Sequence, residues 1–299
     1  MNTKAVRQRR ELFDRRVFAG PLDLSAAELE GETLRFDSEH DRDRAIAIGA
    51  FRLVMPDGFD PEPGRQIAQK FHLPEAANEP GYGGYREEEN LCFWRSAYQM
   101  EQLIISRECR ERLFPAELLA MTRALDQVSA NVLRAILALC DVPQAKWDAL
   151  TGGAASDTGT HWFVANSYRP QVGTLSGCTA HQDTGFVTVL YIEDEGLEGF
   201  VDGAWRSINP RDGYFVVNFG LALKILTRRH RFKPAALKHR VRLEPRSSSA
   251  RHRISFAALA SPPTHGTLYE HSYVGEARPQ HDVDEFLRKQ HLATWREDA

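Results

Sequence analysis

Three potential metal ligands stand in the C-terminal half of the sequence. His181 and Asp183 form an H-x-D tripeptide, and His239 follows 56 residues after Asp183. Residues i and i+2 of a strand point to the same face, so an imidazole and a carboxylate at this spacing can meet one cation. Two imidazoles and one carboxylate leave coordination positions open, which is typical of non-heme Fe(II) oxygenases. Zinc also accepts these ligands, although structural zinc sites usually have four protein ligands.

The H-x-D tripeptide by itself is a weak signal. The chain has eleven His, and about one H-x-D is expected by chance at this length. A structural His–Asp hydrogen bond is the favoured explanation for the tripeptide alone. The segment LKHRV around His239 changes this, because a β-sandwich can bring a third ligand from a distant strand to its interior.

A second group of residues has the chemistry of a carboxylate receptor. Arg253 and Ser255 follow His239 and share one face of a predicted strand. A guanidinium binds a carboxylate with two parallel hydrogen bonds, and the hydroxyl adds a third. The alternative is a surface ion pair with an exposed serine. Upstream, Asn166 and Tyr168 place an amide and a phenol on one strand face, although such a tyrosine alone is more often a core residue.

The elements that must position these groups fall into two regions. Residues 1–150 read as mostly helical with some extended pieces, among them a short buried strand near the end of Ala45–Met55. An apolar stripe of three- and four-residue spacing runs from Pro115 to Cys140. Residues 151–299 begin with the loop 151–159, continue as short strands, and end in a predicted helix from about Asp282 to Trp295. Strands of this length and spacing indicate a sandwich or jelly roll. The predicted strands are His161–Pro170, Phe186–Asp194, a hairpin turning at Asp202-Gly203, Tyr214–Gly220, Leu237–Glu244 and Arg253–Ser261.

In combination, N-x-Y, H-x-D, a distal His and R-x-S occur in one order within residues 166–255. This pattern resembles the Fe(II)- and 2-oxoglutarate-dependent oxygenases, specifically their isopenicillin N synthase-like branch. The stretch HQDTGFVTVLYIEDEGLEGFVDGAWRSINPRDGYFVVNFGLALKILT is similar to their metal-binding core, and GAFRLVMPDGFDPEPGRQIAQKFHLP to their N-terminal region. The resemblance covers about two-thirds of the chain.

The resemblance implies an α+β fold: a double-stranded β-helix (jelly-roll) core with flanking N-terminal helices and a C-terminal helix. It implies Fe(II), 2-oxoglutarate and O2 as cofactors and co-substrates, with ascorbate as a candidate stimulant. It makes His181, Asp183 and His239 the catalytic iron ligands, and the presence of Asp183 argues against a halogenase. The residues implied to bind 2-oxoglutarate are Arg253 and Ser255 at its distal carboxylate, Tyr168 as a positioning group, and Asn166 as a weaker candidate.

The expected function is oxidation of a small molecule by hydroxylation, desaturation or cyclisation, in natural-product biosynthesis. Two alternatives stay open. Isopenicillin N synthase and aminocyclopropanecarboxylate oxidase resemble the same pattern without using 2-oxoglutarate, so an oxidase of this fold is one alternative. A non-catalytic jelly-roll binding protein is the other.

Composition excludes several other classes. The chain has 299 residues, of which 42% are hydrophobic, and a formal net charge of -3, which excludes a strongly cationic nucleic-acid binder. No apolar run approaches the ~18–20 residues of a membrane span. The N-terminal segment is basic without an apolar stretch, and the four cysteines form no C-x-x-C motif. We therefore expect a cytoplasmic protein with a small-molecule partner, bound to neither nucleic acid nor membrane and of open oligomeric state.

Overall fold

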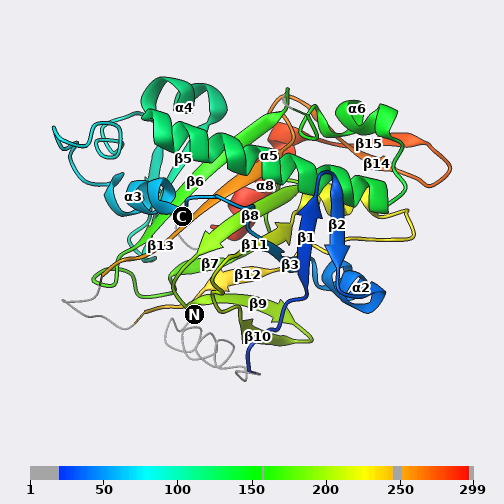
Figure 1. Ribbon diagram of the computed structural model, residues 1–299, viewed down its shortest axis with the longest axis horizontal. Coiled ribbons are helices and arrows are strands. Elements are labelled where there is room, and N and C mark those ends of the chain that lie inside the picture. Colours follow the sequence, from blue (N-terminus) through cyan, green and yellow to red (C-terminus); the bar gives the residue numbers. More distant parts are fainter. Residues whose placement is uncertain (1–19, 157, 245–250, 296–299) are drawn as a thin grey trace, which may run out of the picture.

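Two β-sheets form the centre of the protein (Figure 1). Side chains from both sheets line one cavity. The computed structural model of the chain describes residues 20–156, 158–244 and 251–295. The nine-stranded sheet has the order β2 (Thr33–Phe36), β1 (Ala26–Glu30), β3 (Ala50–Val54), β11 (Tyr214–Phe219), β8 (Val187–Ile192), β13 (Arg253–Ser261), β6 (Thr160–Tyr168), β5 (Met100–Ser106) and β4 (Cys92–Trp94). The four-stranded sheet has the order β10 (Ala204–Ser207), β9 (Leu197–Val201), β12 (His239–Val241) and β7 (Cys178–His181).

Alternation along β13 separates the two faces of the larger sheet. Ala257 and Leu259 face the cavity, whereas Phe256 and Ala258 belong to the hydrophobic core on the other face. That core is covered by α5 (Ala116–Leu139), whose apolar stripe packs on β13 and β8, and by α3 (Glu62–Lys70), which packs on β13 and β6 (Figure 1). The helices therefore hold one face of the sheet rigid and leave the other for a site.

The remaining elements lie around this framework. The chain adds a separate hairpin, β14 (Thr267–His271) with β15 (Ala277–Asp282). The other helices are α2 (Glu39–Ile48), α4 (Arg107–Leu113), the 3₁₀ turn η1 (Gln144–Lys146), α6 (Trp147–Thr151), α7 (Leu221–Thr227) and α8 (Val283–Thr294). The fold is thus α+β with a jelly-roll core and a C-terminal helix, as predicted.

Several local predictions are confirmed. The helix expected from Pro115 is α5, with Pro115 at its N-cap. The Asp202-Gly203 turn joins β9 to β10, and both residues have positive φ, 51° and 77°, as a two-residue hairpin turn of type I′ requires. The strand expected over Leu237–Glu244 is shorter, because only His239–Val241 pairs with its neighbours.

The N-terminal region contributes more to the sheet than its helical texture indicates. Strands β1, β2, β3, β4 and β5 all belong to the nine-stranded sheet, which they extend at both edges beside strands from beyond residue 150. A division of the chain into a region 1–150 and a core 151–299 therefore stays a prediction.

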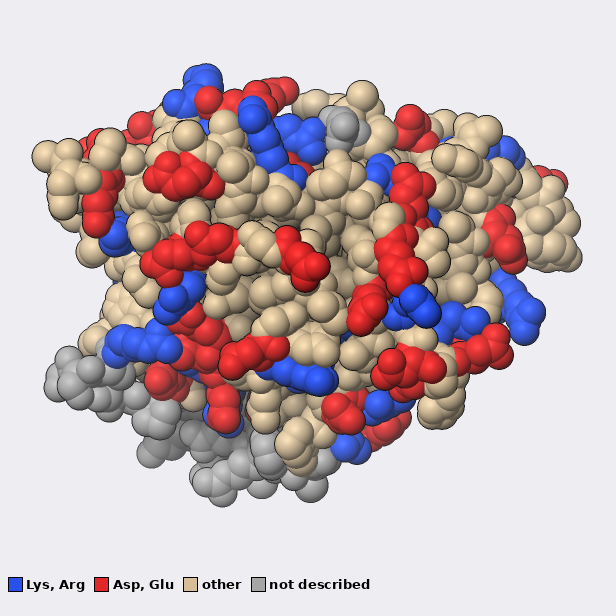
Figure 2. Space-filling view, in the orientation of Figure 1, with Lys and Arg blue, Asp and Glu red and all other residues tan. Residues whose placement is uncertain are grey.

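The expectations of balanced charge and of no membrane-spanning segment can be compared with the described residues. Figure 2 shows acidic and basic side chains intermingled over one face of the molecule. Among the residues that the structure describes, none of the helices combines the length and apolar character needed to span a bilayer. The basic N-terminal segment lies within residues 1–19, outside the described part of the chain. The cytoplasmic location remains a prediction.

Candidate metal centre

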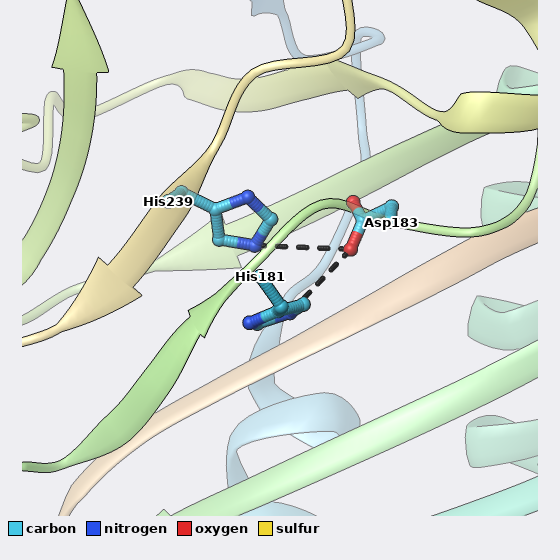
Figure 3. Close-up of side chains that lie close together, drawn as sticks. All are labelled: His181, Asp183 and His239. Carbon is cyan, nitrogen blue, oxygen red and sulfur yellow. Dashed lines mark ion pairs between the residues drawn. The ribbon is translucent and has the colours of Figure 1, made fainter. Parts of the chain in front are cut away.

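Two strands of the smaller sheet bring the two histidines together. In the antiparallel pair of β7 and β12, His181 lies directly opposite His239. Asp183 approaches both rings, with its Oδ1 3.7 Å from each Nε2 (Figure 3). One ligand atom from each residue lies within 4.8 Å of the other two. The structure therefore places the three residues predicted from H-x-D and the distal histidine around one point.

The position of Asp183 differs from the expectation that H-x-D lies on one strand face. Strand β7 ends at His181, and Asp183 belongs to the loop that follows. The Asp183 carbonyl accepts a hydrogen bond from Leu221 N at the start of α7, at 2.8 Å. Gly220 allows this approach, because a Cβ there would overlap the backbone of Gly185. Contact with α7, rather than strand alternation, thus positions the carboxylate.

Hydrogen bonds fix the orientation of both imidazoles. His181 Nδ1 lies 2.9 Å from the carbonyl oxygen of Thr179, and His239 Nδ1 lies 3.1 Å from that of Leu237. A carbonyl oxygen only accepts, so each Nδ1 carries a proton and Nε2 is the nitrogen whose lone pair can bind a cation. Both Nε2 atoms lie on the side of Asp183. Metal-binding histidines commonly have this arrangement, in which one ring nitrogen donates to a carbonyl and the other binds the metal.

The aspartate and the histidines fit a cation better than they fit one another. The separation of 3.7 Å between Oδ1 and each Nε2 is too long for a hydrogen bond. Asp183 Oδ2 is buried and has no hydrogen-bond partner, which is costly for a carboxylate unless another group compensates the charge. Burial and His239 lower the pKa of His181, but interactions with Cys178 and Asp183 outweigh them and raise it. A bound cation would take the place of the proton that this raised pKa favours on His181.

The four residues predicted to bind 2-oxoglutarate lie together on two paired strands. The register of β13 and β6 sets Arg253 opposite Tyr168 and Ser255 opposite Asn166. Asn166 Nδ2 donates to Ser255 Oγ at 3.0 Å, and Gln102 Nε2 on β5 donates to Asn166 Oδ1 at 2.9 Å. Burial raises the pKa of Tyr168, so its phenol stays protonated and can donate to an anion. The group is therefore a preformed row of polar donors.

Arg253 is held in place by one carboxylate and by backbone carbonyls. Its Nε lies 2.8 Å from Glu244 Oε2, and its guanidinium donates to the carbonyls of Glu195 and Arg242. Gly196 permits this placement, because a Cβ on that residue would overlap Arg253 Nη1. The side chain is 10% exposed, so any ligand of Arg253 must enter a confined space.

All seven predicted site residues line a single cavity of about 670 Å³. The register orders its floor into rows that cross β5, β6, β13 and β8. Polar residues of the rows around Arg253 and Ser255 occupy one end. The next rows are mainly apolar, and they contain Ile104, Val164, Ala257, Leu190, Trp162 and Leu259.

Sequence reasoning missed several residues that line the cavity. Gln102 lies on a strand that was not predicted, and Thr188 and Asn218 are neighbours across β8 and β11. One face of α8 also lines the cavity. The sequence predicts a helix over about Asp282 to Trp295, but nothing in it shows that this helix faces the cavity.

The other histidines weighed as ligands lie elsewhere. His230 Nε2 contacts His271 Nδ1 at 3.0 Å, His252 Nδ1 contacts Ser167 Oγ at 2.8 Å, and His161 Nε2 lies 3.3 Å from a carbonyl. Arg95, weighed as an anion-binding residue, stacks on Trp295 with its guanidinium 4.7 Å from the ring centroid.

Comparisons with known proteins agree with this geometry. Residues 159–262 match the family model of the 2OG-Fe(II) oxygenase superfamily. Hyoscyamine 6-dioxygenase of Hyoscyamus niger is 33% identical over 95 residues, 31% of this chain and 26% of the relative. A 2-oxoglutarate-dependent dioxygenase of Gibberella zeae is 42% identical over 67 residues, 22% of this chain and 19% of the relative. The matches thus span about a fifth to a quarter of these relatives' length.

Solved structures show the same fold over nearly the whole chain. A crystal structure of JOX2 in complex with 2OG, Fe and JA has a TM-score of 0.66 at 18% identity, covering 94% of this chain and 92% of that one. The dioxygenase for auxin oxidation of rice has a TM-score of 0.64 at 19% identity, covering 91% and 96%. The isopenicillin N synthase-like branch lies within the same superfamily. Residues 159–262 thus match the 2OG-Fe(II) oxygenase superfamily in sequence, and the chain shares the fold of these solved structures.

Proposed function

We propose that the protein is an Fe(II)- and 2-oxoglutarate-dependent oxygenase that oxidises a small molecule. One observation carries the proposal. His181, Asp183 and His239 converge inside the same cavity that holds Arg253 and Ser255 at one end. A three-ligand site leaves coordination positions free for a co-substrate. The guanidinium of Arg253 can bind the carboxylate of 2-oxoglutarate that lies farther from the metal.

Each protein group has a defined task in this proposal. His181 and His239 bind through Nε2, because carbonyl oxygens hold their Nδ1 protons. Asp183 contributes the negative charge that offsets a divalent cation. Iron, when bound, supplies the activation of O2, and the protein supplies binding, orientation and exclusion of side reactions.

The co-substrate end consists of groups that can hold a carboxylate. Arg253 donates two parallel hydrogen bonds, and Ser255 and Tyr168 offer hydroxyl donors beside it. Asn166 orients Ser255 by donating to its Oγ. In this structure the Arg253 guanidinium pairs with Glu244 and donates to Gln99 and to the carbonyls of Glu195 and Arg242. To bind both guanidinium edges, 2-oxoglutarate must therefore replace some of these contacts, the Glu244 ion pair among them.

The size and lining of the cavity fit a small, largely apolar substrate. The proposed reaction is hydroxylation, desaturation or cyclisation of that substrate. Relatives of the matched segment are named for hyoscyamine, for flavonoid 7-O-demethylation in Ocimum basilicum and for gibberellin in Arabidopsis thaliana. These names support a role in natural-product metabolism. They favour a small molecule over a nucleic acid as the partner.

An anaerobic titration with Fe(II) and 2-oxoglutarate tests the proposal. We expect a weak visible charge-transfer band that needs both components. Substrate-stimulated turnover must then form one succinate for each oxidised product. Product without succinate would instead identify an oxidase of the same fold, and failure to bind Fe(II) and 2-oxoglutarate would leave a jelly-roll binding protein.

A further inference from the structure

One face of α8 forms a wall of the cavity. The residues of the helix and its C-cap that line the cavity recur every three or four positions: Asp284, Leu287, Arg288, His291, Thr294 and Trp295, with Gln290 beside them. Residues at this spacing share one side of a helix. From Asp284 to Trp295 the helix spans about 16 Å, so it can cover much of the cavity's length.

The two ends of α8 are anchored differently, and this sets its direction over the cavity. Trp295 packs on Met100, Tyr168 and Cys178, beside the predicted co-substrate residues. At the other end, Val283 and Phe286 are buried in the main core. The first turn of α8 therefore covers the part of the cavity away from Tyr168. Arg288 stands seven residues before Trp295, about 10 Å along the axis.

Most of the described charged side chains in and beside the cavity are paired, and the exceptions are the metal-site carboxylate Asp183 and the first half of α8. Asp194 pairs with Arg251, Glu195 with Arg242, and Glu244 with Arg253. Within the described part of the chain, no carboxylate lies within ion-pair distance of Arg288. Asp284 precedes it by one turn without contacting it, and lies in the first turn of α8, where the helix N-terminus favours a negative charge. Among the described residues, Arg288 is thus the cationic side chain of this cavity wall that has no ion-pair partner, and it is exposed to solvent.

The floor next to the polar row is apolar. Trp162, Val164 and Leu259 come from paired strands β6 and β13, and Leu287 comes from α8 beside Arg288. An occupant that fits these surroundings has an apolar body and one anionic group. A single planar guanidinium matches a carboxylate, which it binds through two parallel hydrogen bonds.

We propose that the substrate is a small apolar carboxylic acid whose carboxylate pairs with Arg288. This inference rests on the proposed function and adds the substrate class. Arg253 and Arg288 then divide the cavity between them, with one guanidinium for the co-substrate and one for the substrate. Trp295 packs against the cluster that contains Tyr168, with the Arg95 guanidinium over its ring, and so anchors the C-terminal end of the helix that carries Arg288.

The test compares acids with neutral analogues of the same shape. Phenylacetate, hydrocinnamate and cyclohexaneacetate are each titrated beside their primary amides into anaerobic protein loaded with Fe(II) and 2-oxoglutarate, by calorimetry. We expect at least one acid to bind about tenfold or more tighter than its amide. Arg288→Gln must remove that preference, and Arg288→Lys must restore part of it. Lys289→Gln makes the same charge change on a neighbour that is as exposed as Arg288 but does not line the cavity, and it must leave the preference unchanged.

The outcomes separate this inference from the proposed function. Equal binding of acids and amides throughout the panel, or no binding of either, overturns the substrate class while 2-oxoglutarate binding still supports an oxygenase. A preference that Lys289→Gln removes as fully as Arg288→Gln also overturns it, because a general surface field would then be the cause. Failure of the wild-type protein to bind 2-oxoglutarate overturns both.

Discussion

Arg253, which lines the cavity, forms an ion pair with Glu244, with Arg253 Nε 2.8 Å from Glu244 Oε2. Gln99 supports the pair from both sides, because its side chain bonds the backbone of Glu244 and accepts from Arg253 Nη2. The carboxylate of Glu244 thus occupies the guanidinium that we assign to 2-oxoglutarate. Glu244 and the co-substrate therefore compete for one partner.

Removing that competitor should tighten co-substrate binding. Glu244→Gln keeps the shape of the side chain and removes its charge, so we expect the Kd for 2-oxoglutarate to fall about three- to tenfold. This corresponds to about 1 kcal/mol, the scale of a partly exposed ion pair. Anaerobic titration of the iron-loaded protein measures it. Glu195→Gln is the matched control, because the Glu195 side chain pairs with Arg242 instead. An unchanged or higher Kd in Glu244→Gln would contradict the competition.

Gly196 provides a second test of the Arg253 position. Its φ of 135° lies where side chains are strained, and a Cβ would overlap Arg253 Nη1. We expect Gly196→Ala to cost about 1–3 kcal/mol of stability and to weaken 2-oxoglutarate binding about tenfold or more by displacing the guanidinium. Gly203→Ala is the control, because its φ is 77° with open space around the Cβ. It should lose stability without losing co-substrate affinity. Equal affinity of the two variants for 2-oxoglutarate would contradict the assignment of Arg253 as its receptor.

Much of the framework was predictable because local patterns and tertiary packing agree. The stripe of α5 and the apolar runs of β8, β11 and β13 have the periods that their burial demands. The R-x-S and N-x-Y pairs were placed correctly, because alternation on a strand fixes which side chains share a face. Their role in binding 2-oxoglutarate stays a proposal.

Features that depend on contacts between distant segments were not predictable. Asp183 lies past the end of its strand and owes its position to α7, and Glu244 meets Arg253 only in the folded chain. The helix at 282–295 was predicted from its own sequence. Its role as a cavity wall depends on Trp295 packing against Met100 and Tyr168, which no local periodicity encodes.

Loss of one imidazole should abolish metal binding while the fold persists. We expect His181→Ala to weaken Fe(II) binding at least about 100-fold, since only two of the three ligands remain, and to stop 2-oxoglutarate turnover. Equilibrium dialysis with anaerobic Fe(II) measures binding, and circular dichroism checks the fold. His265→Ala, an exposed histidine outside the cavity, is the control and should bind iron normally. Retained binding in His181→Ala would remove the metal assignment.

A buried histidine on the far side of the larger sheet should make stability depend on pH. The pKa of His72 is lowered from 6.5 to about 4, mainly by burial. His252, stacked on it at 5.3 Å, also contributes to the lowering, and Glu101 opposes it. Because the folded pKa lies below the unfolded value, the unfolded chain binds more protons as pH falls from 6.5 toward 4. Stability therefore falls through this window, by about 2–3 kcal/mol from His72 alone.

His72→Phe tests this dependence directly. His72 Nδ1 has no hydrogen-bond partner in the described structure, so phenylalanine keeps the stacking on His252 without leaving a polar group unpaired. We expect the free energy of unfolding in urea to fall less between pH 7 and pH 4.5 in the variant than in the wild type. His265→Phe, an exposed position, should follow the wild-type curve. Parallel curves for His72→Phe and the wild type would show that His72 titrates alike in the folded and unfolded states.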